Sequence, residues 1–181
     1  MSKITRKQTT HLLSRLVERD ILSGTYCASE VTVGIGTGHE FRIDYMKFVP
    51  KNQTTSGIEK GDFYCYEVKS CLDDYKSGNG LNFIGDKNYI VCPMSLYKGL
   101  HLDTGGTLGV YVPIPKDNPC TSESLYYEYQ NPTSLTFNED KWKLHCISPC
   151  SIKFDRKYSV QELLFCMLRS GMGYKDIAME F

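Results

Sequence analysis

Hydrophobic residues in the first third of the chain change from helical spacing to strand spacing. Within 5–22, apolar side chains recur at the spacing of one helical face, which predicts an amphipathic helix: Leu12, Leu13, Leu16, Val17 and Ile21. Ser23-Gly24 ends this helix. Apolar and polar residues then alternate in three stretches typical of strands: 26–35, 40–50 and 61–69. The glycine-rich run Gly34–His39 joins the first two and predicts the tip of a hairpin.

Shorter elements come after the third predicted strand. Turn residues and short apolar runs predict helix, strand, helix and strand in that order, at 70–77, 88–91, 95–100 and 108–114. The next stretch, 116–134, carries prolines and serines around the tyrosine-rich run Leu125–Tyr129. For this run, a packed strand and an exposed contact surface remain alternatives.

The last part of the chain predicts two more strands and a helical hairpin. The strands are expected at 141–147 and 151–154. Ser159 and Glu162 have the spacing of a capping box and begin a helix. Glycines then separate this helix from a second helical stretch, so we expect a C-terminal helical hairpin.

Composition indicates one globular domain. The chain has 181 residues, of which 41% are hydrophobic and 23% are charged, as is ordinary for a protein with a core of its own. The formal net charge is zero, which argues against avid, sequence-independent DNA binding unless positive charge gathers locally. No N-terminal stretch has the apolar character of a signal peptide, and no apolar run approaches membrane-spanning length. We therefore expect a cytoplasmic protein.

The eight cysteines form no Cys-x-x-Cys pair, and free thiols in a reducing compartment are the expectation. His145-Cys146 together with Cys150 has the spacing of part of a zinc site, although a fourth ligand is not evident. A zinc-stabilised transcription regulator is therefore a third and weaker functional hypothesis.

Two of the predicted strands carry charged residues where a core strand should be apolar. Alternation on the third strand puts Glu67 and Lys69 on one face. Burying a carboxylate and an ammonium group is costly, so either they pair with each other or something charged lies between them. The second strand carries Asp44. Because the polar segment 51–60 predicts a long hairpin, we expect Asp44 to lie near Glu67.

An aspartate near the end of one strand, followed by Glu-x-Lys on the next, resembles the PD-(D/E)xK nuclease superfamily. In this chain Arg42-Ile43-Asp44 stands where the family name has Pro-Asp, and Glu67-Val68-Lys69-Ser70 supplies the second part. The next segment is similar to small bacterial and phage members: Asp73-Asp74-Tyr75 in a short helix, then Gly85–Pro93 as a strand ending in proline. The resemblance covers about residues 10–115.

The resemblance implies an α+β fold with a restriction-endonuclease-like core, in which helices flank a mixed β-sheet. The implied order is helix, three antiparallel strands, helix, strand, helix, strand. We expect a single domain, 1–181, with three parts: the core at about 5–115, a tyrosine-rich insertion with extra strands at about 116–157, and C-terminal helices at about 159–181.

The resemblance also implies metal-dependent hydrolysis of DNA, with Mg²⁺ or Mn²⁺ bound by oxygen atoms. The implied catalytic residues are Asp44, Glu67 and Lys69. The implied metal ligands are the carboxylates of Asp44 and Glu67, the main-chain carbonyl of Val68, and Glu30. Glu18 is an alternative to Glu30 as third acid. The candidate contacts to DNA phosphates are Arg42, Lys76 and Lys87.

Two other hypotheses remain open. The charged residues of the two strands can form a buried ion-pair network without a metal. Alternatively, the chain keeps a nuclease scaffold to bind a partner, as phage counter-defence (anti-CRISPR-like) proteins that bind a CRISPR effector do. The tyrosine-rich run and zero net charge favour such a binding module, whereas the set of two acids and a lysine favours the enzyme. Homodimerisation, which many nucleases use to cut both strands, is also open.

Overall fold

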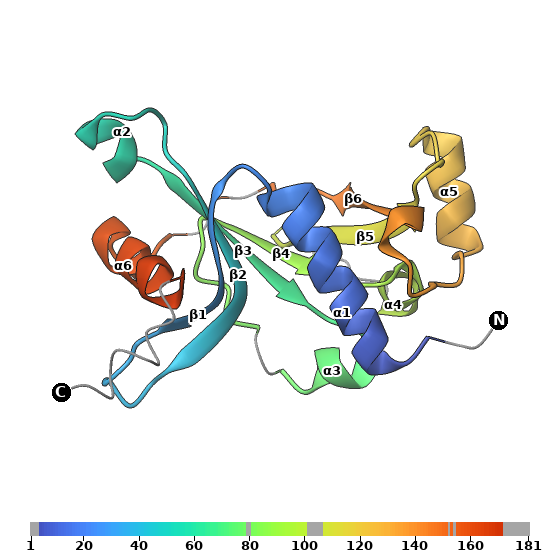
Figure 1. Ribbon diagram of the computed structural model, residues 1–181, viewed down its shortest axis with the longest axis horizontal. Helices are drawn as coiled ribbons and strands as arrows, with labels where there is room; N and C mark the ends of the chain where they lie inside the picture. The colour runs from blue at the N-terminus through green and yellow to red at the C-terminus, as the bar shows by residue number, and fades with distance from the viewer. Residues whose placement is uncertain (1–3, 79–80, 101–106, 152, 154, 172–181) are drawn as a thin grey trace. The chain divides into compact units, whose positions relative to one another are not determined.

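The structure is a computed structural model that describes residues 4–78, 81–100, 107–151, 153 and 155–171 (Figure 1). The fold is α+β, with six strands in mixed β-sheet whose order follows the chain, β1-β2-β3-β4-β5-β6, and with helices packed on it. This confirms the predicted fold class, whereas the restriction-endonuclease-like core stays a prediction.

The chain divides into two compact units, each built from three separate stretches. Unit 1 consists of Met1–Ser23, Val68–Asn79 and Tyr89–Ser151. Unit 2 consists of Gly24–Glu67, Gly80–Asn88 and Ile152–Phe181. Because the units interleave along the sequence, neither corresponds to the predicted core or insertion, and the single-domain organisation stays a prediction.

Most elements of unit 1 lie where the sequence predicts them. Its helices are α1 (Arg6–Val17), a π-helical turn (Glu18–Leu22), α3 (Leu72–Lys76), α4 (Met94–Leu100), α5 (Ser122–Gln130) and a 3-10 turn (Glu139–Lys141). Its strands are β4 (Lys87–Val91, whose first two residues belong to unit 2), β5 (Gly109–Pro115) and β6 (Trp142–Ser148). β4 runs parallel to β5, and β5 runs antiparallel to β6.

Helix α1 begins with a capping box and packs on β6. The Thr5 hydroxyl accepts a hydrogen bond from the main-chain N–H of Gln8 at 3.2 Å, and the Gln8 side chain accepts one from the Thr5 N–H at 2.9 Å. The leucine face predicted from the sequence is buried, and Leu12 and Leu16 pack against Trp142 of β6. This reciprocal cap fixes the helix start at Arg6.

The tyrosine-rich run forms a helix, so the favoured strand at Leu125–Tyr129 is wrong. Thr121 caps α5 by accepting a hydrogen bond from the N–H of Ser124 at 3.2 Å. The buried Glu128 carboxylate accepts two further bonds just beyond the helix, both at 2.8 Å, from the main-chain N–H and the hydroxyl of Thr133. These local hydrogen bonds outweigh the strand preference of tyrosine, which is a weak and context-dependent quantity.

Unit 2 contains the predicted antiparallel strands and the first C-terminal helix. Its elements are β1 (Tyr26–Val33), β2 (Phe41–Val49), α2 (Thr55–Glu59), β3 (Asp62–Val68, whose last residue belongs to unit 1) and α6 (Val160–Gly171). Gly34, Gly36 and Gly38 have positive φ angles of 77°, 77° and 75° in the hairpin between β1 and β2, as the glycine-rich run predicts. α2 is an unpredicted turn of helix in the connection between β2 and β3.

Helix α6 covers β1 in unit 2 (Figure 1). Leu163, Cys166 and Met167 join the core formed by the three strands. The Ser159 hydroxyl accepts a hydrogen bond from the N–H of Glu162 at 3.1 Å, so the predicted N-cap is confirmed. The second helix of the predicted hairpin falls at 172–181, outside the described residues. Of the strand predicted at 151–154, residues 152 and 154 also lie outside them, and residues 151 and 153 are not in a strand.

Candidate functional site

Glu67 lies at the end of β3 and is completely buried, with 0% of its surface exposed. It shares a strand face with Phe63 and Cys65, as the alternation predicts, and both of these belong to the core of unit 2. Burial, and after it the nearby Glu67 carboxylate, raise the pKa of the Cys65 thiol above its ordinary value. The Glu67 carboxyl group therefore lies in an apolar core, where charges interact more strongly than in water.

β2 pairs with β3 up to the residues next to the two predicted acids. The strands are antiparallel, with Tyr45 opposite Tyr66 and Met46 opposite Cys65. Continuing this register by one residue puts Asp44 opposite Glu67. Residues directly opposite each other on neighbouring strands share a face and have Cβ atoms about 5 Å apart. The predicted pairing of the two strands is confirmed, whereas the approach of Asp44, which is half-buried, to Glu67 stays a prediction.

Val68 and Lys69, which come directly after Glu67, belong to unit 1. Both are buried, and Lys69 has only 4% of its surface exposed. The main-chain N–H of Lys69 donates a hydrogen bond to the carbonyl of Val91 at 2.9 Å, which fixes the backbone where β4 ends. A lysine at this degree of burial is rare in a protein core unless its charge is paired.

The residue after this lysine is held by α3. Asp74 accepts hydrogen bonds through Oδ2 from the Ser70 N–H at 3.1 Å and from the Ser70 hydroxyl at 3.3 Å. Its other oxygen, Oδ1, lies 3.2 Å from Nη2 of Arg6 at the start of α1. The sequence motif includes Asp74 without indicating a role for it; the structure makes it the link between the Lys69–Ser70 segment and α1.

Glu30 forms an ion pair with Arg42, with Oε2 and Nε 2.7 Å apart, and both side chains are more than half exposed. Glu30 also has a φ angle of 54°, in the left-handed region that non-glycine residues rarely adopt. The ion pair joins Arg42 of β2 to Glu30 of β1 across the hairpin. The metal role of Glu30 and the phosphate role of Arg42 stay predictions.

The remaining predicted residues occupy separate positions. Lys76 is exposed in the last turn of α3, in unit 1, and Lys87 is half-buried at the start of β4, in unit 2. Glu18, the alternative third acid, forms an ion pair with Arg15, with Oε2 and Nη1 3.3 Å apart. The phosphate contacts of Lys76 and Lys87 stay predictions.

Sequence reasoning missed a buried acid in unit 2. Asp86, with 1% of its surface exposed, accepts a hydrogen bond from the Phe63 N–H at 2.8 Å. Its Oδ1 lies 3.3 Å from Nζ of Lys153 and 3.4 Å from Nε of Arg156. Lys153 also pairs with Asp62 at the start of β3. This network connects β3 to the segment before α6, and the distance of 91 residues between Asp62 and Lys153 left no local signal for it.

The donor atoms present suit a hard cation that needs few protein ligands. Among the described residues, no group of three or more His, Cys, Asp and Glu side chains is arranged to hold a metal ion. This leaves two carboxylates, Asp44 and Glu67, at opposed positions. Mg²⁺ is commonly held by one or two carboxylates and retains several waters, whereas structural zinc takes four nitrogen or sulfur ligands. Mg²⁺ or Mn²⁺ as the cofactor stays a prediction, as does the zinc hypothesis at Cys146 and Cys150.

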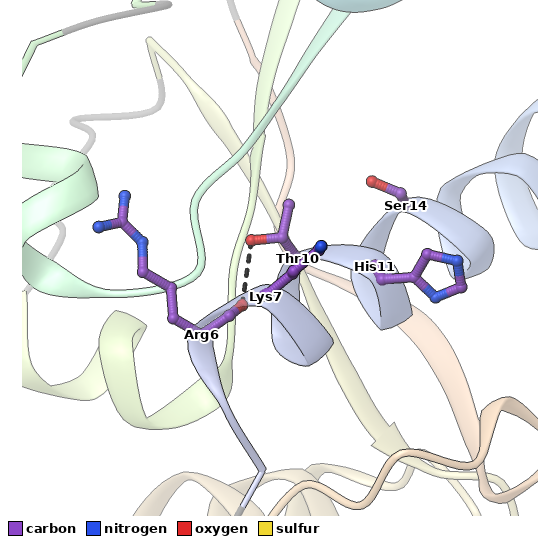
Figure 2. Close-up of a pocket in the computed structure, with 5 residues that line it drawn as sticks. All are labelled: Arg6, Lys7, Thr10, His11 and Ser14. Atoms are coloured by element: carbon purple, nitrogen blue, oxygen red, sulfur yellow. Dashed lines mark hydrogen bonds between the residues drawn. The ribbon is translucent and has the colours of Figure 1, made fainter.

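Two open hollows lie on the surface of unit 1. The first, which we call the α1 hollow, has a volume of about 570 Å³ and is lined by one side of α1: Arg6, Lys7, Thr10, His11 and Ser14 (Figure 2). The second, the α5 hollow, has a volume of about 670 Å³ and is lined by α5 and the residues before it, including Pro119, Tyr126 and Tyr127. Both tyrosines have 66% of their surface exposed.

Comparison with known proteins finds no match to a protein-family model, to a curated protein or to a solved structure. Within the described part of the chain, no helix combines the length and apolar character needed to cross a membrane. Function has to be inferred from the chemistry of the site itself.

Proposed function

We propose that the protein is a metal-dependent DNA nuclease or nickase of the PD-(D/E)xK type. The observations that carry the proposal are the β2–β3 register, which runs up to Tyr45 opposite Tyr66 and which we extend by one residue to Asp44 and Glu67, and the complete burial of Glu67. Like charges directly opposite each other on neighbouring strands destabilise a sheet. A divalent cation between the two carboxylates removes this repulsion, so a metal site explains why two acids occupy these positions.

Asp44 and Glu67 would hold Mg²⁺ or Mn²⁺, with the main-chain carbonyl of Val68 as a further oxygen ligand. The cation would supply a positive charge next to the phosphate that is attacked. The two carboxylates would orient the cation, and the apolar core around Cys65 would keep bulk water away from Glu67.

Lys69 would act on the attacking water or on the negative charge that develops on the phosphate. Two residues of extended chain span at most about 7 Å between Cα atoms, so the covalent chain alone keeps Lys69 near Glu67. The burial of Lys69 supports this role, because an ammonium group removed from solvent acts more strongly on a nearby oxyanion than an exposed one.

A plasmid assay tests the proposal. The purified protein is incubated with supercoiled plasmid in Mg²⁺, in Mn²⁺ and in EDTA, and conversion to open-circular and linear DNA is followed on gels. We expect metal-dependent nicking that Asp44→Asn and Lys69→Ala each reduce by about 100-fold or more, the usual effect of losing one catalytic or charge-stabilising group.

The matched control is Asp73→Asn, which removes an exposed carboxylate from α3 and should nick like the wild type. Circular dichroism spectra verify that all variants are folded. Absence of nicking by the wild type at high protein concentration with either metal, or equal loss of activity in Asp73→Asn, would contradict the proposal.

One observation favours the second candidate, a counter-defence (anti-CRISPR-like) protein that binds a partner such as a CRISPR effector. The α5 hollow presents Tyr126 and Tyr127 to solvent beside Pro119, and tyrosine is enriched at protein interfaces. This candidate predicts that a Tyr126→Ala, Tyr127→Ala double variant stays folded and nicks normally but no longer inhibits a DNA-targeting effector. If the double variant still inhibits the effector, α5 has no role in binding it.

A further inference from the structure

Helix α1 concentrates positive charge in a protein whose net charge is zero. Its twelve residues include the cations Arg6, Lys7 and Arg15 and no acidic residue. Arg15 is compensated by Glu18 and Glu139, whose carboxylates lie 3.3 and 3.4 Å from its guanidinium. Arg6 pairs with Asp74 at 3.2 Å but keeps 61% of its side chain exposed, so Lys7 and the exposed part of Arg6 supply the positive charge at the α1 hollow.

The α1 hollow combines cations with hydroxyl groups on one side of the helix. Its residues lie in two rows at i, i+4 spacing, Arg6–Thr10–Ser14 and Lys7–His11, so all five face the same surface (Figure 2). The Thr10 hydroxyl donates to the carbonyl of Arg6 at 3.2 Å, which leaves its oxygen atom able to accept a hydrogen bond. Cations and hydroxyls at this spacing are the side chains that contact phosphate oxygens in nucleic-acid complexes.

An exposed aromatic ring lies beside the hollow. His11 and Phe137 pack with ring centroids 5.5 Å apart at an angle of 48°, and 54% of the surface of Phe137 remains exposed. An exposed aromatic ring next to a basic surface is the arrangement on which proteins stack unpaired bases while holding the backbone. Bases inside a duplex are already stacked on their neighbours, so this ring favours a single strand.

The same unit links the hollow to the lysine of the proposed catalytic site. Arg6 at one end of the hollow pairs with Asp74, and Asp74 holds the backbone and hydroxyl of Ser70, the residue after Lys69. All four residues belong to unit 1. A nucleic-acid strand cleaved near Lys69 would therefore lie along α1, next to residues that the Arg6–Asp74 ion pair and the Asp74–Ser70 hydrogen bonds connect.

We propose that the α1 hollow binds a single-stranded nucleic acid, with phosphates at Lys7, Arg6 and the neighbouring hydroxyls and a base stacked on Phe137. The inference rests on the proposed function and deepens it by naming the form of the substrate. Binding to the hollow needs no metal, so it is measured separately from hydrolysis.

The test is fluorescence anisotropy with a labelled twelve-nucleotide oligothymidylate in EDTA at low salt, on the full chain. We expect Phe137→Ala to weaken binding about 5-fold or more through lost stacking. We expect Lys7→Ala to lower the slope of log K against log salt concentration by about 0.7, the value for one phosphate contact to a single strand. A duplex of the same length should bind more weakly than the single strand and should not respond to Phe137→Ala.

Two matched controls separate these effects from general charge or surface changes. Phe165→Ala removes an equally exposed phenylalanine from α6, and Lys60→Ala removes an exposed lysine from the end of α2. Both should bind the oligonucleotide like the wild type. Unchanged affinity in Phe137→Ala and unchanged salt slope in Lys7→Ala would overturn the inference, and so would tighter binding of the duplex.

The outcomes for binding and for hydrolysis are distinguishable. If the wild type binds the oligonucleotide through Phe137 and Lys7 but nicks no DNA with either metal, the α1 site stands and the nuclease proposal fails. If it nicks DNA while the Lys7 and Phe137 variants bind and nick like the wild type, the nuclease proposal stands and the α1 site fails.

Discussion

Replacing Glu67 by glutamine distinguishes a metal site from a structural ion pair by the sign of the stability change. The substitution keeps shape and removes one negative charge from a fully buried position. If Glu67 and Asp44 form a metal site, the metal-free protein suffers repulsion between them, and Glu67→Gln relieves it. If Glu67 instead compensates Lys69 in a buried ion pair, the substitution leaves a buried ammonium without its counter-charge.

The two cases differ by several kcal/mol. Opposed side chains on neighbouring strands lie about 5 Å apart, at which two like charges repel by roughly 3 kcal/mol at an effective dielectric constant of about 20. Because Asp44 is only half-buried, solvent reduces this figure, and we expect Glu67→Gln to stabilise the metal-free protein by about 1–3 kcal/mol. Breaking a buried ion pair would instead destabilise it by about 3–5 kcal/mol.

The assay is urea unfolding followed by circular dichroism, in EDTA and with Mg²⁺ or Mn²⁺. A cation at ten times its dissociation constant should stabilise the wild type by about 1.4 kcal/mol, and this increment should disappear in Glu67→Gln. Nicking should be lost in the same variant. For a chain of this length each kcal/mol corresponds to a shift of about 2–4 °C in Tm, which thermal unfolding resolves.

Glu128→Gln is the matched control, because Glu128 is a buried glutamate whose two oxygens accept hydrogen bonds from Thr133. It should lose about 1–3 kcal/mol with or without metal, the cost of disturbing a hydrogen-bonded charge. If Glu67→Gln is less stable than the wild type in EDTA, and if metal does not stabilise the wild type, then Glu67 is structural and the metal hypothesis fails.

Two further predictions concern groups with perturbed pKa values. Burial alone would raise the pKa of Asp62, but hydrogen bonds from Lys153 and Lys51 outweigh it and lower the pKa. Its contribution to stability is therefore present at neutral pH and is lost as pH falls through the lowered pKa, so Asp62→Asn should show a shallower loss of Tm on acidification than the wild type; equal profiles would contradict this. Burial raises the pKa of Cys92 to about 12, so a thiol reagent at pH 8 should label the exposed Cys27 and reach Cys92 only after unfolding. Rapid labelling of Cys92 in the folded protein would show that its position in the core is wrong.

Local patterns predicted most of the elements, because each has its own signal. The leucine spacing and the Thr5 cap define α1, the glycines define the turn before β2, and Ser159 defines the start of α6. The pattern failed at α5, where a run of tyrosines favours a strand and only the cap at Thr121 and the hydrogen bonds of Glu128 favour a helix. Residue preference was outweighed there by contacts that single-residue propensities do not contain.

The candidate site was predictable in part for the same reason. Hairpin pairing depends on the strands on either side of one connection, so the pairing of β2 with β3 could be anticipated. The partners of Arg42 and Asp86 could not, because they depend on the irregular backbone at Glu30 and on Lys153, which is far along the chain. The α1 hollow could not be anticipated, since the ring of Phe137 comes from a distant segment.

The buried acids of the described residues lie at different kinds of position in the fold. Three acidic side chains are buried there: Glu67, Asp86 and Glu128. Asp86 accepts from the Phe63 N–H and faces two cations, and Glu128 accepts from Thr133, so both connect parts of the fold. Glu67 lies near the end of core strand β3, one residue after Tyr66, which pairs with Tyr45. Like charges opposed on neighbouring strands repel unless a cation neutralises them, so Glu67 is the position at which the proposed metal site is tested most directly.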